Sequence, residues 1–391
     1  MKITDVKTFC VFANFRNWVF IKVYTDEGIS GVGEATVEWE SSAVMGAAED
    51  IKQWFIGKDP RDIEGITYWA HRNGYYENNP VLLSALGGYE TALWDILGKS
   101  LQAPVWRLLG GKYRERVPVY GNGWFRGAET PEEYGAAARK AAEEGWLALK
   151  WDPFGAAERT MSRKQLQEAE AQVAAVRQSV GPETQLLIEG HGRFDVATAI
   201  EVAHMLESYD VHYFEEPVIS DNIAGLAEVR RKSNIPIAAG ERLHTLRAFK
   251  DLFIAGGVDV VQPDLIHVGG ISAVRKIAAL AESFGVRISL HNCNGPICTA
   301  ATLHTDLTLP NLDLQEVMLA DAPWRQLVTD EKLLLRNGFY LEVSDKPGIG
   351  VELCEECVED YPPQEIPTFI YEMDFNRDRS LQREGTVQQE S

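Results

Sequence analysis

The pattern of apolar and polar residues changes near residue 116 of this 391-residue chain. From there on, short apolar runs alternate with segments in which apolar residues recur at helical spacing. The apolar runs, which we predict to be strands, are 117–121, 147–152, 186–189, 211–215, 235–239, 258–262, 286–291 and 312–317. The helical patterns between them are 131–144, 163–180, 196–208, 223–232, 245–255, 271–284 and 296–307. Eight strands spaced in this way favour an α/β fold of the (β/α)8 TIM-barrel type over an open α/β sheet.

The residues before and after this region have a different pattern. Residues 1–40 alternate as strands do, with a turn at Asp26-Glu27-Gly28, and residues 41–110 are mostly helical by periodicity. We therefore expect an α+β domain over 1–115, the barrel over 116–330, a further segment over 331–375 and a polar tail over 376–391.

Composition limits the partners that we expect. The formal net charge of -20 disfavours nucleic acid, which needs a basic face, but it is compatible with an anionic substrate if a bound cation reverses the local charge. No apolar run approaches the length of a membrane span, and the N-terminus has no signal-peptide pattern. The five cysteines, with a lone CxxC at Cys354 and Cys357, indicate reduced thiols and a cytoplasmic protein.

Three glutamates end three successive predicted strands. Glu189 and Glu215 are 26 residues apart, as are Glu215 and Glu241, about one strand plus one helix each time. A single acid at a strand end is usually a solvated rim residue, but three adjacent carboxylates repel one another unless a cation lies between them. An all-oxygen ligand set indicates one Mg²⁺ rather than Zn²⁺. Such an ion could hold a substrate carboxylate and stabilise an enediolate.

Proton abstraction beside that carboxylate needs a base, and the strand ends offer one. His291 follows the seventh strand and Asp264 the sixth, so the two are neighbours around the barrel. A carboxylate behind an imidazole fixes its tautomer and raises its basicity. His191, at the third strand, lies across the barrel from His291, where an acid could protonate a leaving hydroxyl. Lys150 and Asp152 share one face of the second strand.

These residues resemble the enolase superfamily, in its mandelate racemase-like branch. The resemblance covers about residues 1–365, and the motifs that carry it are Thr25-Asp26-Glu27-Gly28, Gly33-Glu34-Ala35, Ala92-Leu93-Trp94-Asp95-Ile96-Leu97-Gly98-Lys99, Leu108-Leu109-Gly110-Gly111, Phe214-Glu215-Glu216-Pro217, Gly240-Glu241-Arg242, Gln262-Pro263-Asp264 and His291-Asn292. The resemblance implies a capping domain built from both chain ends, with 331–375 returning to 1–115.

The resemblance also implies roles for individual residues. Glu189, Glu215 and Glu241 would be the metal ligands, His291 with Asp264 the base, and Glu316 a group near the substrate carboxylate. Racemases of this branch carry Lys-x-Lys on the second strand, whereas this chain has Lys150-Trp151-Asp152, which argues against a racemase. A histidine two residues after the first ligand is similar to galactonate dehydratase and related sugar-acid dehydratases, although the first ligand there is more often Asp.

The function that we expect is that of a Mg²⁺-dependent hydro-lyase acting on an aldonate or aldarate, such as a galactonate- or gluconate-like acid. It would remove the C2 proton with His291, eliminate the 3-hydroxyl with His191 as acid, and release a 2-keto-3-deoxy acid. Substrate contacts would come from Lys150, Asp152, Arg193 and Arg242, with Arg16 and Trp18 on the capping loop. We also expect a homo-oligomer. The alternatives are an epimerase or cycloisomerase with the same metal site, and a low-turnover metabolite sensor.

Overall fold

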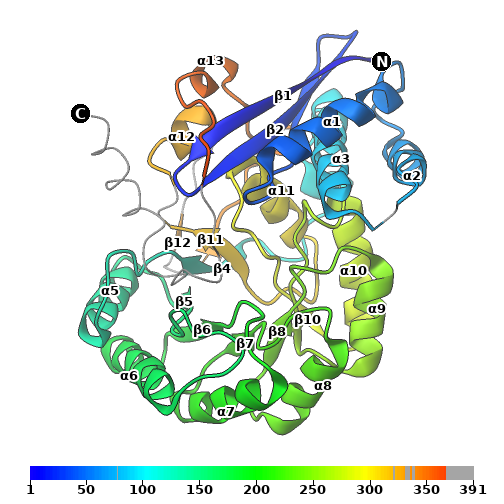
Figure 1. Ribbon diagram of the computed structural model, residues 1–391. Coiled ribbons are helices and arrows are strands. Elements are labelled where there is room, and N and C mark those ends of the chain that lie inside the picture. Colours follow the sequence, from blue (N-terminus) through cyan, green and yellow to red (C-terminus); the bar gives the residue numbers. More distant parts are fainter. Residues whose placement is uncertain (77, 320–321, 331–334, 337–339, 367–391) are drawn as a thin grey trace.

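The computed structural model describes residues 1–366 except 77, 320–321, 331–334 and 337–339 (Figure 1). The predicted polar tail at 376–391 lies outside the described residues, as does part of the predicted segment at 331–375.

The N-terminal region forms an antiparallel sheet covered by helices. Its strands are β1 (Ile3–Ala13), β2 (Arg16–Thr25) and β3 (Ser30–Glu34), and its helices are α1 (Ser41–Phe55), α2 (Ile63–Asn73), α3 (Pro80–Ser100) and α4 (Val105–Leu108). Helix α3 lies so close to β3 that a Cβ atom on Gly33 would be 1.9 Å from the Gly88 carbonyl oxygen. Only glycine permits this contact, which seals a separate apolar core between sheet and helices.

The second region is a closed parallel barrel. Its strands in the described chain are β4 (Val117–Asn122), β5 (Ala148–Trp151), β6 (Gln185–Glu189), β7 (Tyr213–Glu215), β8 (Ile237–Ala239), β9 (Val260–Val261), β10 (Arg287–Ile288) and β11 (Gln315–Met318). From β4 to β10 each strand pairs with the next, Ile288 of β10 forms a bridge to Leu312 just before β11, and β11 pairs with β4. This closure confirms the predicted barrel and rules out the open sheet.

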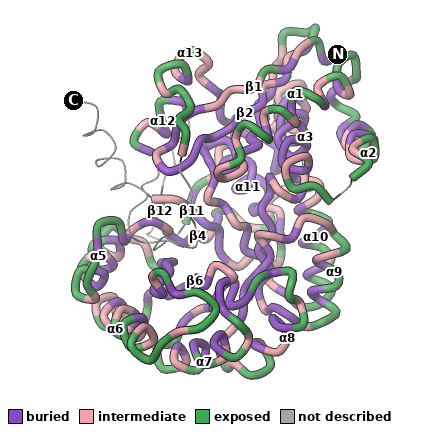
Figure 2. The backbone as a smooth tube through the Cα atoms, in the orientation of Figure 1, coloured by how far each residue is buried: buried purple, intermediate pink, exposed green. Residues whose placement is uncertain are grey.

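Helices surround the barrel (Figure 1). They are α5 (Pro131–Glu143), α6 (Arg163–Val180), α7 (Val196–Leu206), the 3-10 turn η1 (Glu207–Tyr209), α8 (Ile223–Lys232), α9 (Leu246–Ala255), α10 (Ile271–Ser283) and α11 (Pro296–Asp306). The outer faces of α5 to α10 are exposed and their inner faces buried, as Figure 2 shows, whereas every residue of α11 is buried. No helix in the described residues is long and apolar enough to cross a membrane.

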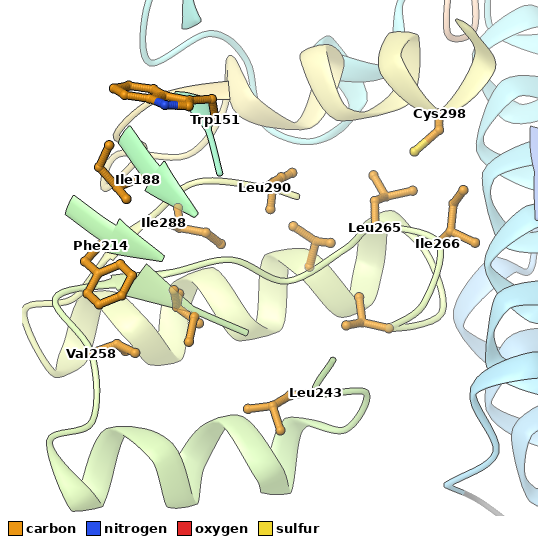
Figure 3. Close-up of a cluster of buried hydrophobic side chains, with 14 of the residues drawn as sticks. Trp151, Ile188, Phe214, Leu243, Val258, Leu265, Ile266, Ile288, Leu290 and Cys298 are labelled. Atoms are coloured by element: carbon orange, nitrogen blue, oxygen red, sulfur yellow. The ribbon is translucent and has the colours of Figure 1, made fainter. Parts of the chain in front are cut away.

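Strand alternation divides the barrel residues into two cores. One set points outward against the helices and includes Ile188 and Phe214 (Figure 3). The other fills the barrel interior and consists of Tyr120, Ala148, Leu187, Tyr213, Ala238, Val260 and Leu314. Because side chains alternate along a strand, the residue two places after an interior residue also points inward. By this alternation, the side chains of four polar residues point inward at the barrel mouth: Lys150, Glu189, Glu215 and Glu316.

The C-terminal segment contacts the N-terminal sheet. Its described elements are α12 (Arg325–Val328), β12 (Leu335–Arg336), β13 (Tyr340–Leu341), which pairs with β4, and α13 (Glu355–Val358). Backbone N–H of Phe12 donates to the Tyr361 carbonyl over 3.0 Å, and the Trp324 ring stacks on both Phe12 and Tyr361.

The cysteine pair at 354 and 357 differs from our expectation of reduced thiols. Cys354 and Cys357 form a disulfide, with their Cα atoms 5.3 Å apart. Cys354 caps α13 and Cys357 lies one helical turn later, and residues three apart on a helix are neighbours. Cys10, Cys293 and Cys298 are free thiols.

Candidate active site

Three carboxylates converge at the barrel mouth. Glu189 and Glu215 are register partners at the ends of β6 and β7, and Glu241 follows β8. One oxygen atom from each lies within 4.8 Å of the other two. Glu189 and Glu215 are buried, and Glu241 is partly exposed. The structure therefore brings together the three residues that the sequence predicts as metal ligands.

The electrostatics of this cluster fit a cation. Burial and the neighbouring Glu189 carboxylate raise the pKa of Glu215 well above its usual value. Oε2 of Glu215 is also buried with no hydrogen-bond partner among the described residues. A buried oxygen without a donor is costly, and a divalent cation would satisfy it and neutralise the like charges. The three glutamates could hold a hard divalent ion, since all three offer oxygen.

Glu216, the next residue, faces away from these oxygens. Its carboxylate accepts from the Ser220 hydroxyl, and Oε2 is 3.0 Å from Nε of Arg242. Burial and Glu241 raise the pKa of Glu216 to about 8. Arg242 lies between acids, because its Nε is also 3.5 Å from Oε1 of Glu241, and its Nη2 donates to the His191 carbonyl oxygen.

Lys150 contributes an ammonium to the same cluster. Its Nζ is 2.8 Å from Oε1 of Glu215, 2.8 Å from Oε1 of Glu316 and 3.4 Å from Oε2 of Glu189. Burial alone would lower the pKa of this amine, but Glu215 and Glu316 outweigh it and raise the pKa well above its usual value. Lys150 is therefore a fixed positive charge at the floor of the site.

The predicted catalytic base, His291, is hydrogen-bonded to Asp264 as expected. Nδ1 of His291 lies 2.8 Å from Oδ2 of Asp264, and the two residues form a parallel bridge beyond β9 and β10. Asp264 is buried and accepts from the Ile266 N–H and from the Asn294 side-chain amide. These bonds leave Nε2 of His291 as the ring nitrogen on the site side, 3.5 Å from Oε2 of Glu241.

The pKa of His291 is raised well above its usual value. Burial lowers this pKa, but the Glu241 carboxylate, the Cys293 side chain and the hydrogen bond to Asp264 raise it by more. A divalent cation bound to Glu241 would neutralise the carboxylate that most raises the His291 pKa. It would thereby favour the neutral imidazole that a base requires.

A second histidine–aspartate pair lies on the other side of the barrel. Nδ1 of His191 is 2.6 Å from Oδ2 of Asp152, and the Arg193 guanidinium also donates to that oxygen. We predicted Asp152 and Arg193 as substrate contacts and did not predict this pairing. The signal was present, because Asp152 and His191 end adjacent strands in the same way as Asp264 and His291.

Arg193 makes further contacts within the protein. Its Nε donates to the Gly190 carbonyl over 3.1 Å and its Nη1 to the Gly155 carbonyl over 2.6 Å. The guanidinium therefore joins the loop after β5 to the loop after β6, and with them the two ends of the His191–Asp152 pair.

Glu316, the second residue of β11, lies beside the base. Its Oε2 accepts from the Asn292 N–H and its Oε1 from the Asn122 side-chain amide, each over 2.9 Å. Burial would raise the pKa of Glu316, but Lys150 and His291 lower it to about 2. The Cys293 thiol lies 3.9 Å from Oε1 of Glu316, a neighbour that we did not predict.

The two residues predicted on a capping loop, Arg16 and Trp18, lie instead in the first three residues of β2, and both are buried. The Arg16 guanidinium donates to the Cys293 carbonyl oxygen and lies 2.7 Å from Oε1 of Glu38. Trp18 is fully buried, and its ring lies against Gly295. Both residues therefore contact the loop that follows the base, which links the capping sheet to the site.

Comparisons with known proteins agree with this geometry. Residues 133–357 match the family described as enolase C-terminal domain-like, and residues 8–110 match the N-terminal domain of mandelate racemase and muconate lactonizing enzyme. A D-gluconate dehydratase from Thermoproteus tenax is 36% identical over 354 residues, 89% of this chain and 71% of that protein. A D-galactonate dehydratase from Pectobacterium atrosepticum is 34% identical over 364 residues, 92% of this chain and 94% of that protein.

A solved structure gives the same assignment. A member of the enolase superfamily from Salmonella Typhimurium superimposes with a TM-score of 0.88 at 33% identity, covering 92% of this chain and 98% of that chain. The resemblance inferred from the motifs is thereby confirmed, and this chain belongs to the enolase superfamily, in the mandelate racemase and muconate lactonizing enzyme family.

Proposed function

We propose that this protein is a Mg²⁺-dependent dehydratase of sugar acids, acting on an aldonate or aldarate. The observation that carries the proposal is the pair of histidine–aspartate dyads on opposite strands, β6 and β10, with the three glutamates between them. Relatives that are D-gluconate and D-galactonate dehydratases support the reaction class.

In the proposed elimination, one dyad acts as the base and the other as the acid. His291, whose Nδ1–H is held by Asp264, takes the C2 proton at Nε2. His191, whose Nδ1 is held by Asp152, gives a proton to the departing 3-hydroxyl from the other face. A divalent cation at the three glutamates, when bound, supplies the positive charge that holds the C1 carboxylate and stabilises charge developing there. The resulting enol tautomerises to a 2-keto-3-deoxy acid.

The epimerase or cycloisomerase alternative requires Lys150 or Asp152 to exchange a proton with substrate directly. Nζ of Lys150 is within 3.4 Å of three carboxylates, and Asp152 accepts from both His191 and Arg193. These contacts favour a fixed charge for Lys150 and a positioning role for Asp152. The sensor alternative has less support, since binding alone needs neither dyad.

The test is a screen of aldonates and aldarates, beginning with D-gluconate and D-galactonate, for Mg²⁺-dependent formation of 2-keto acid. We expect His291→Asn to abolish both dehydration and C2 proton exchange in deuterated solvent. We expect His191→Asn to abolish dehydration and retain exchange.

His204→Asn is the matched control, because His204 is exposed on α7 and its Nε2 bonds to the Lys232 carbonyl, away from the site. Its turnover should equal that of the unmodified protein. Failure to dehydrate any sugar acid, or full activity in His291→Asn, would contradict the proposal.

A further inference from the structure

A second group of ligand atoms lies beside the three glutamates. His291, Cys293 and Glu316 each offer one atom, and these three atoms lie within 4.8 Å of one another. His291 and Cys293 are partly exposed, and Glu316 is buried. This group differs in chemistry from the three glutamates, because it combines a nitrogen, a sulfur and an oxygen.

The spacing is close to that of a tetrahedral metal site. Zinc bonds of about 2.0–2.3 Å to nitrogen, oxygen and sulfur place neighbouring ligand atoms roughly 3.3–3.8 Å apart. Sγ of Cys293 is already 3.9 Å from Oε1 of Glu316. Contraction of the set by about 1.5 Å or less would complete three protein ligands, with a fourth position open to solvent.

The surrounding bonds orient the set for a metal. Asp264 holds Nδ1 of His291, which is the arrangement that presents the other ring nitrogen to zinc in protein sites. The Asn292 N–H likewise holds Oε2 of Glu316 and leaves Oε1 toward the thiol. The Arg16 guanidinium fixes the Cys293 backbone through its carbonyl oxygen.

Two donors to Oε1 of Glu316 limit the affinity of this set: the Asn122 side-chain amide and the Lys150 ammonium. The Lys150 ammonium is 2.8 Å from Oε1 of Glu316 and would repel a cation there. We therefore expect reversible binding, weaker than at a closed structural zinc site.

We propose that His291, Cys293 and Glu316 form a second metal site, selective for thiophilic divalent ions such as Zn²⁺ and Cd²⁺. The thiol proton passes to solvent as the metal–sulfur bond forms, with no change of oxidation state. Thiolate ligands select such ions, whereas the three glutamates suit Mg²⁺. The ion would occupy Nε2 of His291, the atom that takes the C2 proton, so its binding inhibits dehydration. This inhibitory role rests on the proposed function.

The binding test uses Cd²⁺ added to the full-length protein in saturating Mg²⁺, monitored by the ultraviolet charge-transfer band of a cadmium–thiolate bond. The background carries Cys354→Ser and Cys357→Ser, so that this pair does not contribute. We expect a saturable band of one ion per chain, lost in Cys293→Ser, and an affinity reduced on the order of tenfold or more in Glu316→Gln. Cys10→Ser is the control, and its band should be unchanged. A missing band, or one that persists in Cys293→Ser, overturns the proposed site.

The inhibition test measures dehydration at fixed Mg²⁺ with added Zn²⁺. We expect inhibition that sugar acid relieves and additional Mg²⁺ does not. Inhibition that additional Mg²⁺ relieves would place Zn²⁺ at the three glutamates and contradict the inhibitory role. If no sugar acid is dehydrated, the proposed function fails, whereas the Cd²⁺ measurement still decides the metal site.

Discussion

At the scale of single residues, the proton chemistry depends on carboxylates that do not touch substrate. Asp152 is buried at the end of β5 and accepts from both His191 and Arg193. Its carboxylate holds Nδ1–H of His191 and so fixes the orientation of the ring, as a carboxylate behind a catalytic imidazole does. Asp264 does the same for the base.

We expect Asp152→Asn to lower kcat by about 10–100-fold, since mutating a partner that orients a functional histidine typically costs this much. KM should change little, because no substrate contact is removed. Asp313→Asn is the matched control: Asp313, two residues before β11, lies 2.9 Å from Nε2 of His212 in a similar pair away from the site. Steady-state kinetics and the pH profile of kcat measure the effect, and equal kcat values in the two variants would refute the positioning role.

At the scale of elements, the capping sheet and the barrel are joined at one helix start. Glu34, the last residue of β3, is buried, and its carboxylate accepts from the backbone N–H groups of Gly295 over 2.6 Å and Cys298 over 2.9 Å. These groups belong to the first turn of α11, which has no side-chain cap of its own. A carboxylate there satisfies free N–H groups and complements the helix dipole.

We expect Glu34→Ala to lower the free energy of unfolding by about 1–2 kcal/mol and also to reduce kcat, because α11 begins directly after the loop that carries His291. Thr130→Ala should lower stability by about 1 kcal/mol with kcat unchanged, since Thr130 caps α5 far from that loop. Urea unfolding and kinetics on both variants separate the effects. An unaltered kcat in Glu34→Ala would show that the cap does not position the base.

Element boundaries show what periodicity predicts well. The predicted helix 271–284 is α10 (Ile271–Ser283), because an amphipathic helix is specified locally by its own spacing. The predicted strand 286–291 has ladder pairing only at β10 (Arg287–Ile288). Strand length depends on where the neighbouring strand stops offering hydrogen bonds, and a single sequence does not contain that information.

The candidate site also contains some features that the sequence predicts and others that it does not. The three glutamates followed from strand alternation and an even 26-residue spacing, both local features. The Asp152–His191 pair and the contacts of Lys150 with three carboxylates depend on the register between strands and on which side chains reach across the barrel. Those distances arise only on barrel closure, so sequence reasoning assigned Asp152 and Lys150 to the substrate instead.

At the scale of the whole molecule, described segments from before and after the barrel meet on one sheet. Nζ of Lys22 on β2 is bonded to Oε1 of Glu355 on α13, and Trp324 stacks between Phe12 and Tyr361. The N-terminal sheet is therefore held by segments that follow the barrel in sequence. We expect unfolding to be cooperative across the sheet and the barrel for that reason.

Global stability should also depend on pH through His304. This histidine is buried in α11, its Nδ1 accepts from the Trp106 N–H over 3.3 Å, and burial lowers its pKa to about 3. The ordinary histidine pKa in an unfolded chain is about 6.5. Between these values the unfolded chain binds a proton that the folded chain does not. The free energy of unfolding therefore falls as pH drops from 6.5 toward 3, by up to about 1.4 kcal/mol per pH unit.

We expect His304→Asn, which keeps an acceptor for Trp106, to be less stable at pH 7 but to lose less stability on acidification than the unmodified protein. Asp306 on the same helix acts in the opposite direction, since burial raises its pKa and the folded chain then holds the extra proton. The contribution of Asp306 is the same in His304→Asn and in the unmodified protein, so it cancels when the two are compared. Urea unfolding at several pH values between 4 and 7 measures the two slopes, with exposed His204→Asn as the control. Parallel slopes in His304→Asn and the unmodified protein would mean that His304 takes up its proton in the folded state, and that the packing around the last turn of α11 is open enough to admit it.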